Sequence, residues 1–313
     1  MARAANNLRR LAATLTGAVP LLVIAAVLLP AGCGSSSNSS GGRPIVVAAE
    51  NFWGSIASQL GGDKVQVRSI IVNPSTDPHS YEPTAADGRL LAQSQMAIVN
   101  GIGYDPWAPK LLAANPAGGR VVLNVGDLVG AHEGDNPHRW YNPADVQSVI
   151  RATVADLKRI RPADAAYFDQ REQALQTQGL ARYKQLIARI RVRYGGVPVG
   201  ASESIFAQQA PALGVSLITP PAFMKAISEG TEPSPADRAT VDQQITSRQI
   251  EVWIYNSQNS TPDIQRLTSE ARRTGIPIAT VTETLQPPTA SFQEWQSSQL
   301  LGIAQALARA TGR

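Results

Sequence analysis

The chain has 313 residues, of which 43% are hydrophobic and 17% are charged, enough apolar side chains for one large core or two modest ones. The 28 basic and 24 acidic residues include three arginines and no acid within the first 32 positions, so the rest of the chain has 25 basic against 24 acidic residues. Without a basic stripe, nucleic-acid binding is excluded as the basis of function.

Residues 1–32 have the pattern of an export signal, in which arginines precede a long apolar run and small residues precede Cys33. A retained membrane anchor is the alternative, because residues 11–30 are about long enough to span a bilayer. Cys33 argues against this anchor. It is the only cysteine, so it forms no internal disulfide, and a packed core residue is not expected beside GSSSNSSGG. We therefore expect residues 33–43 to be a flexible tether.

From residue 44, short β-branched runs alternate with stretches of helical spacing. Strands are predicted at 44–49, 65–71, 95–100 and 120–124. Helices are predicted at 55–62, 84–94 and 106–115. This alternation is typical of βαβ units on a largely parallel sheet and predicts an N-terminal α/β lobe over residues 44–160.

Residues 143–194 contain no strand candidate. A helix is predicted at 142–160, and Arg161 before Pro162 marks a break. A second helix follows over 165–194, weakened at Gly179. Some 30 helical residues reach about 45 Å, longer than one small lobe needs. We therefore expect residues 161–194 to be a linker helix between two lobes.

After residue 195 the alternation returns and predicts a C-terminal α/β lobe over 195–313. Strands are predicted at 197–202, 214–219, 251–256 and 277–282, and helices at 204–213, 235–247, 261–275 and 292–312. The predicted fold class is α/β, with two lobes that carry parallel-type sheets.

Four possible metal ligands follow predicted strands. His79 and His138 come from the first lobe, and Glu203 and Glu283 come from the second. The carboxyl ends of parallel strands meet at one edge of a sheet, where ligand sites form. Neutral imidazoles suit first-row transition metals, and two carboxylates balance the charge of a dication. The pattern predicts a metal site in the cleft between the lobes.

Each residue also has a simpler interpretation. A histidine in a proline-bounded loop is more often exposed or bonded to the backbone than a ligand. Glu203 can be an acid at the start of a helix, stabilised by the helix dipole, and Glu283 can be solvated. His132, in AHEGDN, is expected to be solvated. Tyr81 and Trp140 can exclude water from the site or serve only in packing.

The motifs DPHSYEPT, NPHRWYNP, GASESIFAQQ and TVTETLQP, in this order and spacing, resemble those of the metal-binding lipoproteins that deliver zinc or manganese to bacterial ABC importers. The resemblance covers the chain from residue 44 to its end. It implies two α/β lobes joined by a rigid helix, with His79, His138, Glu203 and Glu283 as ligands. The fourth ligand of the family is usually aspartate, so Glu283 departs from its pattern.

The resemblance also implies lipidation of Cys33, a lipid anchor on the outer face of the cell membrane, and an ABC permease as partner. Pro30 departs from the usual lipoprotein signal. The transported ion would be Zn²⁺ or Mn²⁺, and no catalytic cofactor is implied. The third ligand, Glu203, and the short segment AHEGDN lean toward manganese, whereas the general affinity order favours zinc. A monomer is the default expectation.

Two other functions stay open at this point. An exported zinc hydrolase needs an open coordination position and a separate general base, and the chain has no HExxH motif to provide them. GASES lacks the final glycine of a nucleophile elbow, and no histidine follows it. GIGYD, residues 101–105, lacks the third glycine of a dinucleotide loop and is read as a turn. A binding protein for a metal chelate or an adhesion partner would use the same body without direct coordination.

Overall fold

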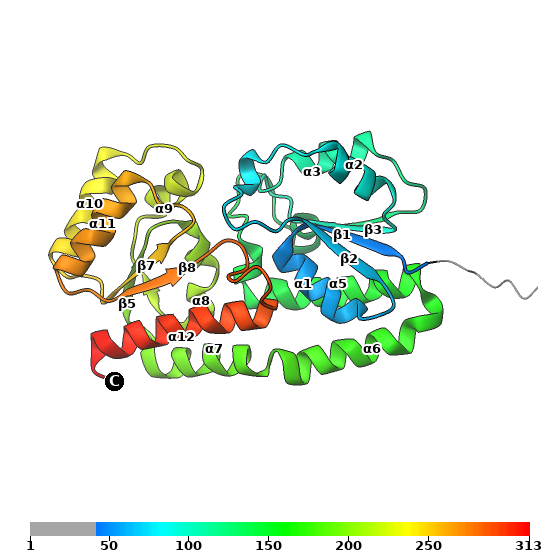
Figure 1. Cartoon of the computed structure of the whole chain (residues 1–313). Coiled ribbons are helices and arrows are strands. Elements are labelled where there is room, and N and C mark those ends of the chain that lie inside the picture. The colour runs from blue at the N-terminus through cyan, green and yellow to red at the C-terminus, as the bar shows by residue number, and fades with distance from the viewer. Residues whose placement is uncertain (1–41) are drawn as a thin grey trace, which may run out of the picture. The chain divides into compact units, whose positions relative to one another are not determined.

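The computed structural model describes residues 42–313 (Figure 1). The predicted signal over 1–32 and the predicted lipidation of Cys33 lie outside the described residues, as does all of the tether except Gly42 and Arg43. Within residues 42–313, no helix is both long and apolar enough to cross a membrane.

The first sheet has four parallel strands in the order β2-β1-β3-β4. They are β1 (Ile45–Glu50), β2 (Gln66–Ile71), β3 (Met96–Val99) and β4 (Val121–Asn124). Alternate residues of β1 serve opposite faces, since Val46 lies in the large core with Phe52 whereas Val47 packs with Leu91. Both faces are thus buried at the centre of the sheet, which explains the continuous apolar character of β3 and of β1 up to Glu50.

Helices cover both faces of this sheet (Figure 1). α2 (Ala85–Ala92) and α3 (Trp107–Ala114) lie on one face, and α1 (Asn51–Gly61) and α5 (Pro143–Ile160) lie on the other. α1 begins four residues before its predicted start, and the added first turn buries Phe52 and Trp53. The short helix α4 (Val125–Val129), directly after β4, was not predicted.

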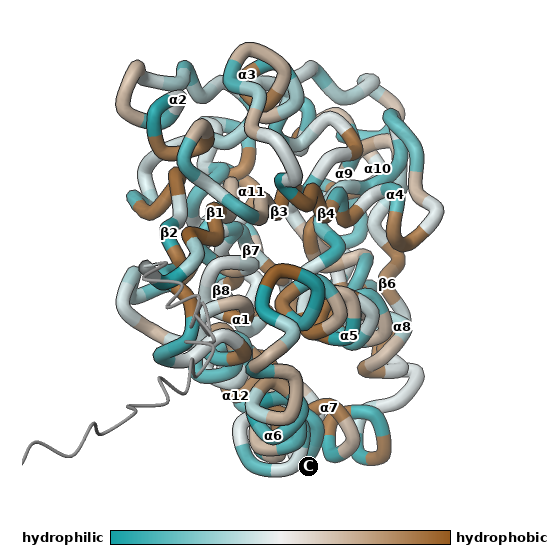
Figure 2. Tube along the Cα trace, turned by 90° about the vertical axis from the view of Figure 1, so that its right-hand side faces the viewer, coloured by the Kyte–Doolittle hydropathy of each residue, from teal (hydrophilic) through white to brown (hydrophobic). Residues whose placement is uncertain are grey.

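The second sheet repeats the first in its order, β6-β5-β7-β8, and is also fully parallel. Its strands are β5 (Pro198–Ala201), β6 (Ser216–Leu217), β7 (Val252–Asn256) and β8 (Ile278–Val281). All eight predicted strands are therefore present, and the α/β fold class with parallel sheets is confirmed. In Figure 2 the apolar colour follows β1 and β3 through the interior of the molecule.

The helices of this second half are α8 (Ala210–Leu213), α9 (Pro221–Ser228), α10 (Pro235–Thr246), α11 (Pro262–Arg273) and α12 (Phe292–Thr311). The helix predicted at 204–213 is instead a 3₁₀ segment, Ser204–Gln208, followed by α8. Pro211 explains the division, because it has no N–H for a continuing helix and fits the first turn of a new one. α9 was not predicted, although Pro221 occupies its first turn.

A helical segment connects the two halves. The break at Arg161 is present, and α6 (Ala165–Ala174) continues through a π-helical turn, Leu175–Gly179, into α7 (Ala181–Tyr194). α6 packs against α1 and α5, whereas α7 packs against α8 and α12. The segment thus reaches from the first sheet's helices to those of the second. The lobe boundaries at residues 160 and 195 stay a prediction.

α12 makes a second connection, because it runs beside α7 and its first turn contacts α1 (Figure 1). The Phe292 N–H donates to Ser55 Oγ at 2.9 Å, and the side-chain amides of Gln59 and Gln293 bond to each other. The two halves of the chain are therefore fastened to each other by two helical elements.

Candidate metal centre

The candidate ligands lie beyond the carboxyl ends of the strands of both sheets. In each sheet the strand order reverses between two central strands, β1 and β3 in the first and β5 and β7 in the second. A crevice forms at such a point, because the loops after the two strands leave in opposite directions. Glu203 follows β5 and Glu283 follows β8, whereas His79 and His138 are carried by the loops after β2 and β4.

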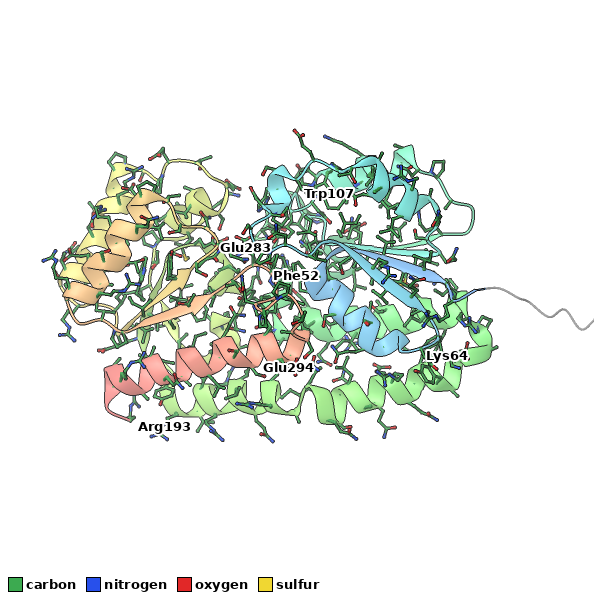
Figure 3. All side chains as sticks on the ribbon, viewed as in Figure 1. Phe52, Lys64, Trp107, Arg193, Glu283 and Glu294 are labelled. Atoms are coloured by element: carbon green, nitrogen blue, oxygen red, sulfur yellow. The ribbon has the colours of Figure 1, made fainter. Side chains whose placement is uncertain are left out.

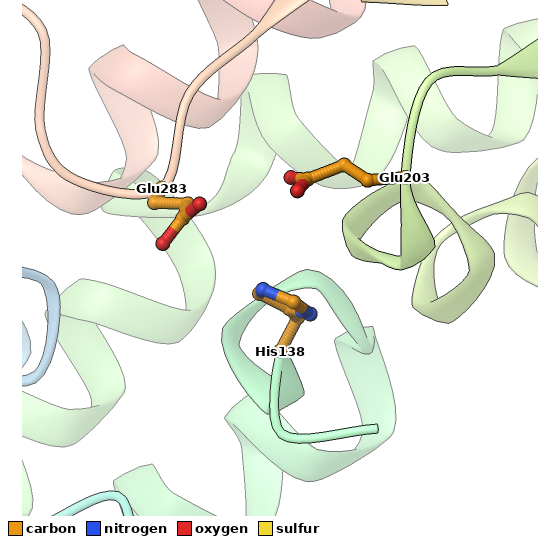
Figure 4. A group of neighbouring side chains, drawn as sticks. All are labelled: His138, Glu203 and Glu283. Atoms are coloured by element: carbon orange, nitrogen blue, oxygen red, sulfur yellow. The ribbon is translucent and has the colours of Figure 1, made fainter. Parts of the chain in front are cut away.

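Three of the four candidates converge (Figure 4). One ligand atom each from His138, Glu203 and Glu283 lies within 4.8 Å of the other two. His79 is not a member of this group. It lines a cavity of about 710 Å³ together with Glu283, and a second of about 500 Å³ together with His138. The structure therefore brings three candidates together and places His79 beside them, and the ligand assignment stays a prediction.

His138 is a buried, neutral imidazole with a fixed orientation. Asn136 Oδ1 accepts hydrogen bonds from the His138 backbone N–H at 3.1 Å and from Nδ1 at 2.8 Å. Asn136 Nδ2 donates to Ser204 O, so its oxygen faces the imidazole. Nδ1 therefore carries the hydrogen, and the Nε2 lone pair is free for a metal. Burial, and secondarily the charge of His79, lowers the pKa of His138 to about 3.

His79 lies in a 3₁₀ turn, Pro78–Ser80, which Asp77 begins by accepting the His79 backbone N–H at 2.9 Å. Its Nδ1 is 3.3 Å from the carbonyl oxygen of Gly103. Since a carbonyl only accepts, Nδ1 is the donor, and Nε2 is again free. This carbonyl belongs to the GIGYD turn, in which Gly101, Ile102 and Gly103 all have positive φ, at 71°, 59° and 74°. A β-branched residue such as isoleucine rarely has a positive φ, so the backbone at Ile102 is strained beside the site.

Glu203 is buried and points toward the site. It occupies the residue before the Ser204–Gln208 segment but makes no capping hydrogen bond, so the helix-start interpretation does not describe its side chain. Asn256 Nδ2 donates to Oε1, and Asn259 Nδ2 donates to Oε2 at 2.7 Å. Burial, and secondarily the charge of Glu283, raises the pKa of Glu203 to about 8.

Glu283 is partly exposed at the wall of the larger cavity. The Tyr104 hydroxyl donates to Oε2 at 3.1 Å, and Asn256 Nδ2 donates to Oε1 at 3.0 Å. Desolvation raises the pKa of Glu283, although the nearby His79 acts in the opposite direction. Glu283 is therefore fixed by partners from both halves of the chain.

The charges at this site fit a dication. Across residues 42–313, no lysine or arginine forms a salt bridge with Glu203 or Glu283. Figure 3 shows Glu283 between the two halves, whereas Lys64, in the turn after α1, and Arg193, on α7, lie away from it. Two desolvated carboxylates without a cation repel each other, and both have raised pKa values. Two imidazoles and two carboxylates provide nitrogen and oxygen ligands that Zn²⁺ and Mn²⁺ accept.

The neighbouring aromatic residues differ in their roles. Trp140 is fully buried, with its ring centroid 5.2 Å from that of His138 and stacked at 4.0 Å on Phe52. It thus covers one side of the imidazole. Tyr81 instead packs edge-on to Trp107 and donates to Asp87, so its contacts lie within the first half. His132 is exposed, as expected for a solvated residue.

The polar residues that bond to the candidate ligands were not predicted from the sequence. They are Tyr104, Asn136, Asn256 and Asn259. The available signal was their position, since Asn256 ends β7 and Asn136 precedes His138 by two residues. Uncharged side chains at strand ends and beside candidate ligands can therefore be as informative as acids and histidines.

Comparison with known families gives a match over residues 46–306 to the family described as "Zinc-uptake complex component A periplasmic". The chain belongs to this family. The resemblance identified from the four motifs is thereby confirmed.

Individual relatives are distant, and their matches cover from about half to most of the chain. The manganese ABC transporter substrate-binding lipoprotein of Streptococcus pneumoniae is 23% identical over 286 residues, which is 84% of this chain and 87% of that protein. The high-affinity zinc uptake system protein of Bacillus subtilis is 25% identical over 174 residues, 48% of this chain and 54% of that protein. A manganese-bound periplasmic metal-binding protein of Candidatus Liberibacter asiaticus has the same fold, with a TM-score of 0.70 at 20% identity, over 85% of this chain and 100% of that one.

Proposed function

We propose that this protein is an extracytoplasmic solute-binding protein that captures a divalent transition metal ion, Zn²⁺ or Mn²⁺, and delivers it to an ABC permease. The observation that carries the proposal is the convergence of His138, Glu203 and Glu283 within 4.8 Å, in a chain that belongs to a zinc-uptake family. The names of the relatives support both ions, since one is a substrate-binding lipoprotein of a manganese ABC transporter and another belongs to a zinc uptake system.

Capture requires the four ligand side chains to close around one ion. His138 and His79 offer Nε2, because Nδ1 of each is held by an oxygen acceptor. Glu203 and Glu283 offer carboxylate oxygens and lose their protons as the ion binds. The ion then neutralises two carboxylates that no lysine or arginine of the described residues pairs with. Two cavities reach the site and provide room for the ion to enter and leave.

The remaining expectations belong to the same proposal. A lipid on Cys33 would anchor the protein to the outer face of the membrane, and residues 33–43 would let the body reach its permease. The body would act as a monomer with an N-terminal lobe over 44–160, a linker helix over 161–194 and a C-terminal lobe over 195–313. The bound ion would be cargo rather than a catalytic cofactor, and the protein would not be an enzyme.

The test is a calorimetric titration of the purified, metal-stripped protein with Mn²⁺ and Zn²⁺, each alone and in competition. We expect one ion per chain, with the competition ranking the two metals. His79→Ala and His138→Ala should each lower the affinity by more than about 100-fold, because loss of an outer partner alone costs about 10–100-fold. His132→Ala is the matched control, since it removes an exposed histidine of the same loop region.

Three results would separate the alternatives. If neither ion binds, the capture proposal fails. If both ions bind but His79→Ala and His138→Ala keep the affinity of the unchanged protein, direct coordination by these residues is wrong and a chelate becomes the better ligand. Equal losses in all three variants, including His132→Ala, would point to a general effect of removing histidine.

A further inference from the structure

The turn after β7, residues 256–259, bears three amide side chains that contact the ligand-bearing loops. These are Asn256, Gln258 and Asn259, within the sequence NSQN. None of them was a candidate ligand, and an uncharged amide is a poor ligand for a transition metal beside imidazole and carboxylate. Their hydrogen bonds instead orient the candidate ligands and the loops that carry them.

Asn256 connects the two carboxylates. Its amide nitrogen carries two hydrogens and donates to Oε1 of Glu203 and to Oε1 of Glu283. The orientation of the amide is fixed, because its oxygen accepts the backbone N–H of Gln258 at 3.0 Å. Asn256 is fully buried at the end of β7, so these bonds are shielded from water. One neutral group thus holds two acids at a set separation.

Asn259 completes the arrangement at Glu203. Its amide nitrogen donates to Glu203 Oε2 at 2.7 Å and to the carbonyl of Ile227, at the end of α9, at 3.1 Å. Both oxygens of Glu203 therefore accept from the same turn. This leaves the carboxylate with one defined orientation. Oε2 also accepts from Ser228 Oγ at 3.5 Å, whereas Oε1 keeps a second lone pair for an ion.

Gln258 extends these contacts to the loop that carries His79. Its oxygen accepts the backbone N–H groups of Glu283 at 2.6 Å and Thr284 at 3.0 Å. Its nitrogen donates to the carbonyl of Pro74 at 2.6 Å, in the loop between β2 and His79. One side chain therefore ties the Glu283 loop of the second half to the His79 loop of the first.

We propose that the 256–259 turn is the positioning element of the metal site, in which Asn256 holds Glu203 and Glu283 together before the ion arrives and Gln258 couples their loop to His79. The inference rests on the proposed function. These amides are positioning residues, because they act through the ligands. With the carboxylates already oriented, metal binding orders fewer side chains and loses less entropy.

The first test compares Asn256→Ala with Gln244→Ala in the metal-stripped protein. Gln244 is a matched control, because it is a buried amide of α10 that donates to the carbonyl of Ile218 rather than to a ligand. We expect Asn256→Ala to weaken Mn²⁺ or Zn²⁺ binding by about 10–100-fold, the usual effect of losing an outer-shell partner. Gln244→Ala should lower the thermal midpoint of the metal-free protein and leave the affinity unchanged.

The second test is a double-mutant cycle between Gln258→Ala and His79→Ala. If Gln258 acts through the His79 loop, Gln258→Ala should cost about 10-fold or more in affinity in the unchanged protein and little once His79 is absent. An equal cost in both backgrounds would refute the coupling. Asn259→Ala, at a less buried position, carries the prediction of the first test if Asn256→Ala does not fold.

The outcomes separate this inference from the proposed function. If the unchanged protein binds neither ion, the proposed function itself fails. If it binds and Asn256→Ala binds equally well, the positioning role is overturned and capture stands. If Asn256→Ala and Gln244→Ala lose the same affinity, the role of Asn256 is only structural, which also overturns the inference.

Discussion

Metal binding should release a proton from Glu203, and the number of protons can be worked out from the structure. With a pKa of about 8, this carboxyl is about 90% protonated at pH 7 and about 25% protonated at pH 8.5. The ion must displace that proton to reach the oxygen, so we expect about 0.9 proton released per ion at pH 7 and about 0.2 at pH 8.5.

The other ligands leave this difference in place. His138, with its pKa lowered to about 3, holds no proton to release at pH 7. The pKa of Glu283 is raised in the same direction as that of Glu203, so any proton it releases adds to the count. The release should therefore be larger at pH 7 than at pH 8.5.

The assay is isothermal titration of the metal-stripped protein in buffers of different ionisation enthalpy. The slope of the observed heat against that enthalpy gives the protons released, at each of the two pH values. A slope close to zero at pH 7, with intact metal binding, would refute the reasoning, since it would mean that Glu203 is already ionised or is not a ligand. A slope that does not fall between pH 7 and pH 8.5 would also contradict it.

Three further outcomes are expected. Asn136→Ala should weaken metal binding about 10–100-fold, because His138 Nδ1 loses the acceptor that orients the ring. Calorimetric titration measures the affinity, and an unchanged affinity would show that the acceptor is dispensable. Glu283→Gln should lower the affinity by more than about 100-fold, beyond the effect of an outer partner, and a small loss in the same titration would remove Glu283 from the ligand set. The metal-free protein should lose about 2 kcal/mol of stability between pH 6.5 and pH 8 through Glu203. A carboxyl whose pKa is raised in the folded state favours folding at low pH. This contribution is lost as the pH rises toward the folded pKa of about 8. Denaturant unfolding at the two pH values measures the loss, Glu203→Gln should reduce it, and an identical loss in that variant would contradict the assignment.

The strands and the strand-end positions of the candidate ligands could be predicted from the sequence. β-Branched runs bounded by glycine, asparagine or proline mark all eight strands, and the parallel arrangement places the residues after them at one edge. This is why the sequence pattern groups Glu203 with Glu283, although the two residues are 80 positions apart in the chain.

Other features could not be predicted, for physical reasons. Asn256 and Asn136 act through hydrogen bonds that depend on where a partner residue lies, and sequence pattern does not give that distance. The short helices α4 and α9 have too few turns to show a period. α1 begins early because Phe52 and Trp53 gain burial in its first turn, a tertiary effect that local propensity does not contain.

The two helical connections between the halves affect the fraction of molecules that are in a binding-competent conformation. A receptor whose competent conformation is rare has its apparent affinity reduced by that fraction. Here α7 and α12 run side by side, and α12 is bonded to α1 through Phe292 and Gln293. We expect this arrangement to keep the loops of the candidate ligands opposite each other without an ion. For the proposed capture function, most molecules should then be competent, and the affinity measured by titration should be close to the intrinsic affinity of the site.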